Sequence, residues 1–237
     1  MEQTSYTSSK PTVSDASLED RLEFIRNTYL HLGLAIFAFV GFEYVLFATG
    51  IADAFANFVF SYSISWIGIL VLFMIVGNVA NRWAHSDATP GMQYLGLGLY
   101  VLAEAILFIP LLFMAMDYSS PLVIPSAAII TLCVFGGLTL FVFTSKKDFS
   151  FLRSGLALAT MIAIGLIVVS ILFGFDLGII FSVVMVGLAG GYVLYETSNV
   201  LHHYNPEQHV AASLALFAVI ALMFWYVLRI LMRLNRR

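Results

Sequence analysis

The segment YETSNVLHHYN, residues 195–205, places a carboxylate, an amide and an imidazole at the end of a long apolar stretch. Glu196, Asn199 and His203 are spaced i, i+3 and i+7, which puts them on one face of a helix if the helix continues that far. Together they could bind a proton or a cation. The alternative is a solvated helix end, where a protonated histidine is favoured by the helix dipole.

Two further carboxyl groups lie deeper within apolar stretches, Glu43 in the first and Glu104 in the third. An ionisable group at such a depth costs about 2.5–3.5 kcal/mol on insertion scales, so each needs a reason. One reading is a protonated carboxyl that is hydrogen-bonded to a neighbouring helix, and the other is a proton or cation site. We therefore predict a proton or ion site among Glu196, Glu104, Glu43, Asn199 and His203.

Other membrane chemistries fit the sequence poorly. A catalytic zinc site needs about three protein ligands, and the histidines at span ends and in loops lack HExxH or HxxxH spacing. A retinal protein needs a lysine within a span, and every lysine lies outside the apolar stretches. We predict no enzyme, no metal and no cofactor. The histidines at span ends and in loops are His85, His202, His203 and His209, and the lysines are Lys10, Lys146 and Lys147.

The composition is that of an integral membrane protein. Of 237 residues, 61% are hydrophobic and 11% charged, and the mean hydropathy is +0.95; soluble domains carry about 25% charged residues. Seven stretches reach the length of about 20 residues that a helical span needs. They are residues 28–50, 62–82, 92–115, 121–144, 151–173, 177–200 and 209–231.

The short connections predict an all-α membrane protein whose sequential helices are neighbours in a compact bundle. We expect residues 1–26 to form a flexible cytoplasmic tail with a short interfacial helix, and residues 27–237 to form the seven-helix domain. Ser17 and Asp20 fit a loose capping box at the start of that short helix.

The basic residues predict the orientation. A cytoplasmic tail puts seven of them on the inner side and none in the loops 51–61, 116–120 and 174–176. The C-terminal arginines would then lie outside if the last segment crosses, or inside if it re-enters. We favour a crossing, because 210–228 is uncharged and of full length. The inner set is Lys10, Arg21, Arg26, Arg82, Lys146, Lys147 and Arg153, and the C-terminal set Arg229, Arg233, Arg236 and Arg237.

Three segments resemble the Bax inhibitor family, in its YccA-like bacterial branch. YETSNVLHH resembles the motif that ends the sixth helix, FTSKKDFSFLRSGL (143–156) the loop between helices four and five, and IRNTYLHLGLAIFAFVG (25–41) the start of the first helix. The resemblance extends from about residue 20 over nearly the whole chain. It implies seven helices with the last one central in a surround of six.

The resemblance also implies a pH-sensitive calcium or proton leak, gated by a carboxylate pair from helices six and seven. Two close carboxylates share a proton, so such a pair responds to pH. Glu196 matches the first member, but the second falls on Val219, and a further polar position of the family falls on Leu222. Residues 208–237 contain no Asp or Glu. A partner of Glu196 would have to come from elsewhere, such as Glu43, Glu104, His31 or His203.

YccA-like relatives are linked to FtsH, a membrane AAA protease. The second hypothesis is therefore an interaction protein that modulates, or is degraded by, an FtsH-like protease, which could grip the flexible tail. The two hypotheses are compatible. The partners that we expect are the lipid bilayer, protons or calcium, and such a protease, but no nucleic acid. The expected location is a bacterial inner membrane.

Overall fold

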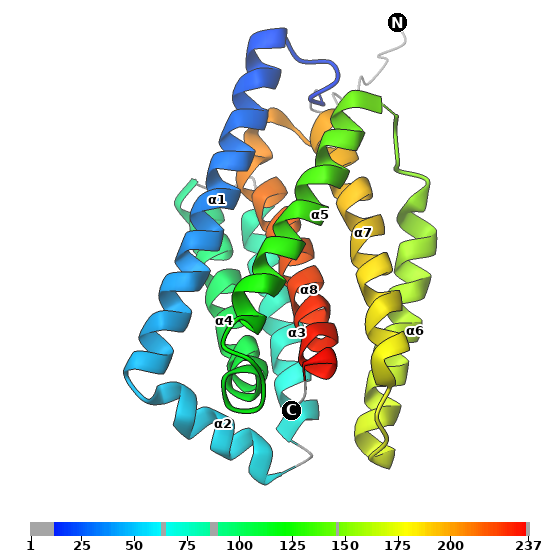
Figure 1. The fold of residues 1–237 in the computed structure, drawn as a ribbon. Coiled ribbons are helices and arrows are strands. Elements are labelled where there is room, and N and C mark those ends of the chain that lie inside the picture. The colour runs from blue at the N-terminus through cyan, green and yellow to red at the C-terminus, as the bar shows by residue number, and fades with distance from the viewer. Residues whose placement is uncertain (1–11, 63–64, 86–89, 146, 236–237) are drawn as a thin grey trace, which may run out of the picture.

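A computed structural model describes residues 12–62, 65–85, 90–145 and 147–235 of the chain, and these form helices without any strand. Seven of the helices are long and apolar enough to cross a membrane (Figure 1), so the predicted all-α, seven-span fold is confirmed. The helices are α1 Leu18–Ala48, α2 Ile51–Ser61, α3 Ser65–Ala84, α4 Pro90–Tyr118, α5 Val123–Ser145, α6 Leu152–Phe173, α7 Gly178–His202, η1 Pro206–Gln208 and α8 His209–Leu234.

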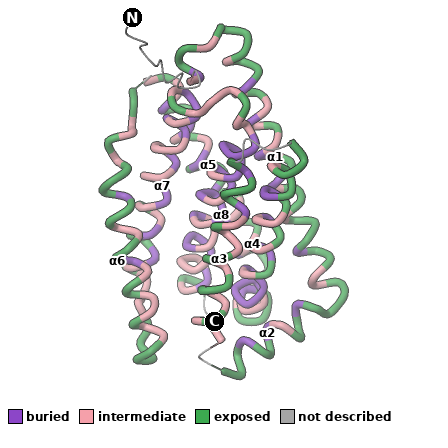
Figure 2. Tube along the Cα trace, turned by 180° about the vertical axis from the view of Figure 1, so that it is seen from behind, coloured by how far each residue is buried: buried purple, intermediate pink, exposed green. Residues whose placement is uncertain are grey.

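The last helix, α8, occupies the centre of the bundle, as predicted. It packs against α1, α3, α4, α5 and α7, and Figure 2 shows its buried residues surrounded by more exposed helices. Fifteen of the 26 residues of α8 are buried, but only two of the 22 in α6. A helix that is apolar all round is stable in the middle of a bundle. The helix α6 instead packs mainly on α7, and its outer side faces the lipid.

The helix α1 begins at the predicted cap. Ser17 is the N-cap, and its hydroxyl accepts a hydrogen bond from the backbone N–H of Asp20 and donates one to the Asp20 carboxylate. From Leu18 the helix runs without a break to Ala48, so the expected interfacial helix and the first span are one element. Residues 1–11 lie outside the described part, and the division at residue 26 remains a prediction.

The connection after α1, which we expected to be a loop, contains the short helix α2. Ala52, Ala56 and Val59 are spaced i, i+4 and i+7 and are all buried. This narrow apolar stripe packs α2 against α4 and α1 at the lower end of the bundle in Figure 1. Its 11 residues are too few for a span, which is why a search for spans overlooks it.

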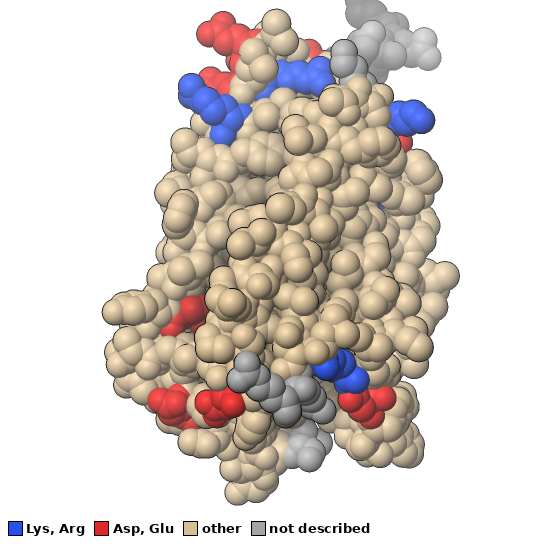
Figure 3. All heavy atoms as spheres, viewed as in Figure 1, with Lys and Arg blue, Asp and Glu red and all other residues tan. Residues whose placement is uncertain are grey.

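The two ends of the bundle differ in charge: Figure 3 shows both basic and acidic side chains at the upper end and mainly acidic side chains at the lower end. The described chain begins at the upper end in Figure 1, called here the N-terminal end, and α8 finishes at the opposite end, so α8 runs along the bundle and is long and apolar enough for the crossing that we favoured. There, Arg233 forms an ion pair with Asp176 in the α6–α7 connection, and the Arg229 guanidinium lies 6.0 Å from the centroid of the Tyr226 ring. The Arg233 guanidinium, and then the Gly178 N–H, hold the pKa of Asp176 below its ordinary value.

Gly96 fixes the closest approach between α3 and α4. A Cβ atom at this position would lie 2.6 Å from the backbone oxygen of Ala80 and 2.8 Å from the backbone nitrogen of Ala84. Small residues at helix contacts let the backbones approach in this way. A Cβ atom added at Gly98, two residues further along α4, would have no neighbouring atom within 4 Å.

We expect Gly96→Ala to lower the thermal unfolding temperature in detergent, because the added methyl group meets backbone and must push α3 away from α4. Overpacking of this kind costs about 1–3 kcal/mol. Gly98→Ala is the matched control and should leave the unfolding temperature unchanged or raise it. Equal unfolding temperatures for Gly96→Ala and the unmodified protein would contradict this close packing.

Candidate functional site

Glu196 lies in the last two turns of α7, at the N-terminal end of the bundle. Its Oε2 atom accepts a hydrogen bond from the Asn199 side-chain amide at 3.2 Å and a longer one from the Tyr204 hydroxyl at 3.5 Å. Burial, followed by the negative charge of Glu196, raises the pKa of Tyr204 well above its ordinary value. Tyr204 therefore keeps its proton and remains a hydrogen-bond donor to this carboxylate.

Tyr204 is held in place by the segment that precedes α1. Its backbone oxygen accepts a hydrogen bond of 2.8 Å from the backbone N–H of Val13, and the Val13 side chain is completely buried. The Tyr204 ring also lies 6.3 Å from the rings of Phe24 and His85. The N-terminal segment thus supports the residue that contacts Glu196. This contact could not be predicted from the Ser/Thr-rich sequence around Val13.

None of the hydrogen bonds described for the Glu196 carboxylate comes from a second carboxyl group. Its partners are Asn199 and Tyr204, and the described residues contain no group of three or more His, Cys, Asp or Glu side chains that could hold a metal ion. Val219, where the resemblance places the partner, is buried in the apolar core around α8.

His203, which shares a helix face with Glu196 in sequence, instead pairs with Asp148. Its Nε2 atom lies 3.0 Å from Oδ2 of Asp148. The Ser198 hydroxyl and the Ser150 backbone N–H both donate to Oδ1, at 3.1 and 2.8 Å, and the Phe149 N–H donates to the Ser198 hydroxyl at 2.9 Å. This Asp148 cluster fastens the α5–α6 connection to the end of α7.

The Asp148 cluster was not predicted, because its members are about fifty residues apart and nothing in either segment alone indicates the contact. The signal that was present is that both segments, 143–156 and 195–203, contain polar residues at the end of a span on the same side. The hydrogen bonds, led by the Ser150 backbone N–H, lower the pKa of Asp148 from its ordinary 3.8 to about 2.

Glu104 lies near the middle of α4 and is buried. The Tyr100 hydroxyl, one turn earlier, is its polar neighbour. The Tyr100 ring lies edge-on to Phe217 of α8 at 6.3 Å and 5.8 Å from Phe73 of α3. Glu104 thus belongs to the region where α3, α4 and α8 meet, while Glu196 belongs to the end of α7.

Glu43 lies in the last two turns of α1, close to the opposite end of the bundle. It is 8% exposed, and neither carboxyl oxygen has a hydrogen-bond partner among the described residues. Its neighbours one turn later, Leu46 and Phe47, pack on the small cluster around Ala52. The three carboxyl groups therefore stand at three depths of the bundle and do not converge on one site.

The family described as "Inhibitor of apoptosis-promoting Bax1" matches residues 21–237. The chain is similar to Bax inhibitor 1 of Schizosaccharomyces pombe, with 36% identity over 49% of this chain and 45% of that protein. It is 26% identical to protein lifeguard 4 of Mus musculus, over 95% of this chain and 91% of the mouse protein. The uncharacterized protein PA2604 of Pseudomonas aeruginosa is 32% identical over 46% of this chain and 49% of its own length.

We expect Asp148→Asn to lower the thermal unfolding temperature at pH 7, because the neutral amide weakens the bonds of the Asp148 cluster. The pKa of Asp148 in the folded protein, about 2, lies below its ordinary 3.8. Its stabilising contribution is therefore fully present above about pH 4 and is lost as the pH falls toward 2. The difference in unfolding temperature between variant and unmodified protein should be constant from pH 7 to about 4 and shrink below.

The control for this experiment is Asp117→Asn, which changes an exposed carboxylate at the end of α4. It should not lower the unfolding temperature at pH 7. If Asp148→Asn unfolds at the same temperature as the unmodified protein at pH 7, the cluster does not fasten α7 to the α5–α6 connection.

Proposed function

Because the chain belongs to the Bax inhibitor family, we propose that it is a membrane protein that lets cations leak across the bilayer in a pH-dependent way, and that Glu196 is its gate. The observation that carries the proposal is the setting of this carboxyl group. It lies within the bundle at the end of a span and is bonded to one amide and one hydroxyl. Ionisable groups in such positions mark ion and proton paths.

Of the two cations that the family suggests, the proton fits this chain better than calcium. Calcium takes six to eight oxygen ligands, with several carboxylates among them. The described residues contain no group of three or more His, Cys, Asp or Glu side chains that could hold a metal ion, and Val219 occupies the position that the resemblance assigns to the second carboxylate. A proton needs only one basic group at a time, so a lone carboxylate is sufficient.

The proposed gate opens when Glu196 becomes protonated. Hydrogen bonds to an ionised acceptor are roughly twice as strong as those between neutral groups. The ionised carboxylate therefore holds Asn199 and Tyr204, and with them the connection between α7 and α8. Protonation weakens both bonds and releases this connection. Flux should accordingly rise as the pH on the N-terminal side falls.

The other predicted site residues have separate parts in the proposal. Asn199 positions the Glu196 carboxylate. His203 secures the end of α7 through Asp148 and does not share the proton of Glu196. Glu104 and Glu43 are proposed to bind protons deeper in the membrane, independently of the gate, since their described contacts are on other helices.

We further propose that the N-terminal end faces the cytoplasm of a bacterium and that the protein resides in the inner membrane. The support is the distribution of basic residues at the N-terminal end of the bundle, where α1 and α6 begin and α3 and α5 finish: Arg21, Arg26, Arg82, Lys147 and Arg153. The positive-inside tendency places such an end in the cytoplasm. The two basic groups described at the other end are engaged with Asp176 and Tyr226.

Proton flux into liposomes that contain the purified protein tests the proposal. We expect flux through the unmodified protein to rise as the pH falls, and flux through Glu196→Gln to be high at all pH values, because the amide mimics the protonated carboxyl. An entrapped pH-sensitive dye provides the measurement. A parallel series with a calcium-sensitive dye decides between the two cations.

Glu19→Gln, at an exposed position in the first turn of α1, is the control and should keep the pH dependence of the unmodified protein. Identical pH-dependent flux in Glu196→Gln and in the unmodified protein would remove Glu196 from the gate.

A second proposal, compatible with the first, is that an FtsH-like membrane protease engages the chain by its N-terminal tail. The deletion that tests this idea must end before Val13, because the Val13 side chain is buried and its backbone N–H donates a hydrogen bond to the Tyr204 carbonyl. A deletion that reaches residue 16 would disturb the bundle as well as the tail. Deleting only residues 2–11 should lengthen the half-life of the protein in cells that contain the protease. An unchanged half-life would argue against engagement through the tail.

A further inference from the structure

The helices α5 and α7 each turn a stripe of buried residues toward the interior, and hydroxyl groups interrupt both stripes. The two helices pack directly on each other and on α8. The Gly190 backbone of α7 lies close to the Leu138 side chain of α5. The stripe on α5 comprises Val123, Ala127, Thr131, Phe135, Thr139 and Val142, and that on α7 Ser182, Met185, Ala189, Val193, Thr197 and Val200.

These four interior hydroxyls are unpaired. The hydroxyl oxygens of Thr131, Thr139, Ser182 and Thr197 are all buried, and none has a hydrogen-bond partner within the described chain. Thr144, one turn beyond Thr139 on the same helix, shows the usual arrangement instead, since its hydroxyl donates back to the Leu140 and Phe141 carbonyls. Leaving a buried hydroxyl without a partner destabilises the folded protein. Other hydroxyls without a partner are found in the described chain at Thr28, Tyr29 and Ser119, but α5 and α7, which pack on each other, hold four of them.

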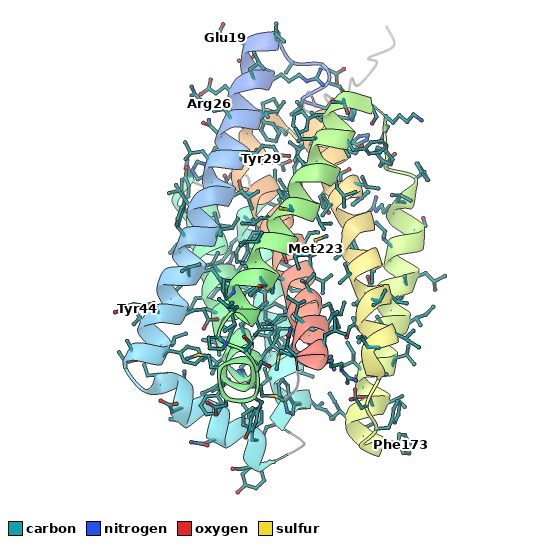
Figure 4. All side chains as sticks on the ribbon, in the orientation of Figure 1. Glu19, Arg26, Tyr29, Tyr44, Phe173 and Met223 are labelled. Carbon is teal, nitrogen blue, oxygen red and sulfur yellow. The ribbon has the colours of Figure 1, made fainter. Side chains whose placement is uncertain are left out.

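At the N-terminal end, the row of hydroxyls meets a third helix. The Tyr29 hydroxyl of α1 faces both Thr139 and Thr197, although no aligned hydrogen bond joins them. Figure 4 shows Tyr29 between α1 and α5, whereas Tyr44 lies on the outer side of α1. The Tyr29 ring is fixed by Phe143, with the ring centroids 6.0 Å apart. Thr197 directly follows Glu196 on a neighbouring face of α7, so this hydroxyl cluster begins within one helical turn of the proposed gate.

At the opposite end, the row finishes at Ser182 in the second turn of α7, next in sequence to a residue that packs on α8. Ser182 follows Phe181, whose ring packs at 5.9 Å on Tyr226 of α8, and Tyr226 in turn lies under the Arg229 guanidinium. Fifteen residues separate Ser182 from Thr197, which is about 22 Å along a helix at 1.5 Å per residue. The hydrocarbon core of a bilayer is about 30 Å thick. The row therefore covers most of the membrane.

We propose that the hydroxyls of Tyr29, Thr139, Thr197, Thr131 and Ser182 line the path of the proton between Glu196 and the opposite side, along the α5–α7 interface beside α8. The inference rests on the proposed function and names the path that this function needs. Thr139 and Thr131 are eight residues apart on α5, about 12 Å along a helix, so water that enters the interface carries the proton between them. Each hydroxyl then accepts a proton from the water on one side and donates its own to the water on the other. No group is consumed, and the proton taken up at one end equals the proton released at the other.

The chemistry of the lining also restricts the ion. The hydroxyls are neutral, and the row between Thr197 and Ser182 contains no carboxylate on either stripe. Calcium would have to shed its water and bind to hydroxyls alone, which its preference for carboxylate and carbonyl oxygens disfavours. The path thus selects protons independently of the gate.

The first test removes single hydroxyls and measures proton flux in liposomes at the pH where the unmodified protein leaks. Tyr29→Phe, Thr139→Val and Thr197→Val should each lower flux by about tenfold, the effect of one lost partner on a transfer barrier. The pH dependence should not change, because Glu196 is intact. A variant that unfolds in detergent at the temperature of the unmodified protein shows that the fold is preserved.

Matched controls lie on the same helices. Tyr192→Phe removes a tyrosine hydroxyl that bonds to Thr160 of α6 at 2.9 Å, on the far side of α7. Thr144→Val removes the hydroxyl that bonds back to its own helix. Both should leak as the unmodified protein does. If Tyr29→Phe and Thr197→Val also leak normally while Glu196→Gln has lost its pH dependence, the path is refuted and the gate stands.

A second measurement tests the path without relying on flux. In a Cys133→Ser background, Thr139→Cys and Thr197→Cys should react with a small, charged, water-soluble methanethiosulfonate reagent in membranes, because water reaches a proton path. Leu140→Cys, at an exposed position on the lipid-facing side of α5, should not react. If the cysteines at positions 139 and 197 react but the unmodified protein shows no proton flux, water enters the interface and the proposed leak is rejected. Absence of reaction at both positions would reject the path.

Discussion

The constraint on which this structure depends is that the bilayer interior offers no water, so polar groups must find partners within the chain. Helices satisfy this for the backbone. Most hydroxyls satisfy it locally, as Thr144 does on α5 by bonding to its own helix. Among the described residues, the buried polar groups without a hydrogen-bond partner are the carboxyl of Glu43 and the hydroxyls of Thr28, Tyr29, Ser119, Thr131, Thr139, Ser182 and Thr197. Function is best sought where this constraint is not met.

The surroundings of Glu196 illustrate how a carboxylate is accommodated at the edge of such a medium. Its partners are supplied by its own helix and by the connection to α8, and that connection is itself secured from two directions. Val13 bonds to Tyr204 from the N-terminal segment, and Asp148 bonds to Ser198 and His203 from the α5–α6 connection. Three segments far apart in sequence thus meet around the end of α7.

The central position of α8 follows from a related argument. A helix that is buried on nearly every side cannot carry charges along its length, and α8 has none between His209 and Arg229. Its charges are gathered at the end, where Arg233 pairs with Asp176. This pair offsets the charge of one arginine near the end of α8, at the end of the bundle opposite the start of α1.

The sequence alone determined the membrane class, the seven spans, the family and the helix cap at Ser17, because these depend on composition and on local patterns that each segment carries by itself. It also identified Glu196, Glu104 and Glu43, since a charge in an apolar run is visible without a fold. Only the tertiary structure decided which groups meet: that Glu196 contacts Tyr204, that His203 turns to Asp148, and that the three carboxyls stay apart. Such contacts depend on how helices are rotated and packed against one another, and small packing differences distributed over the entire bundle set that rotation.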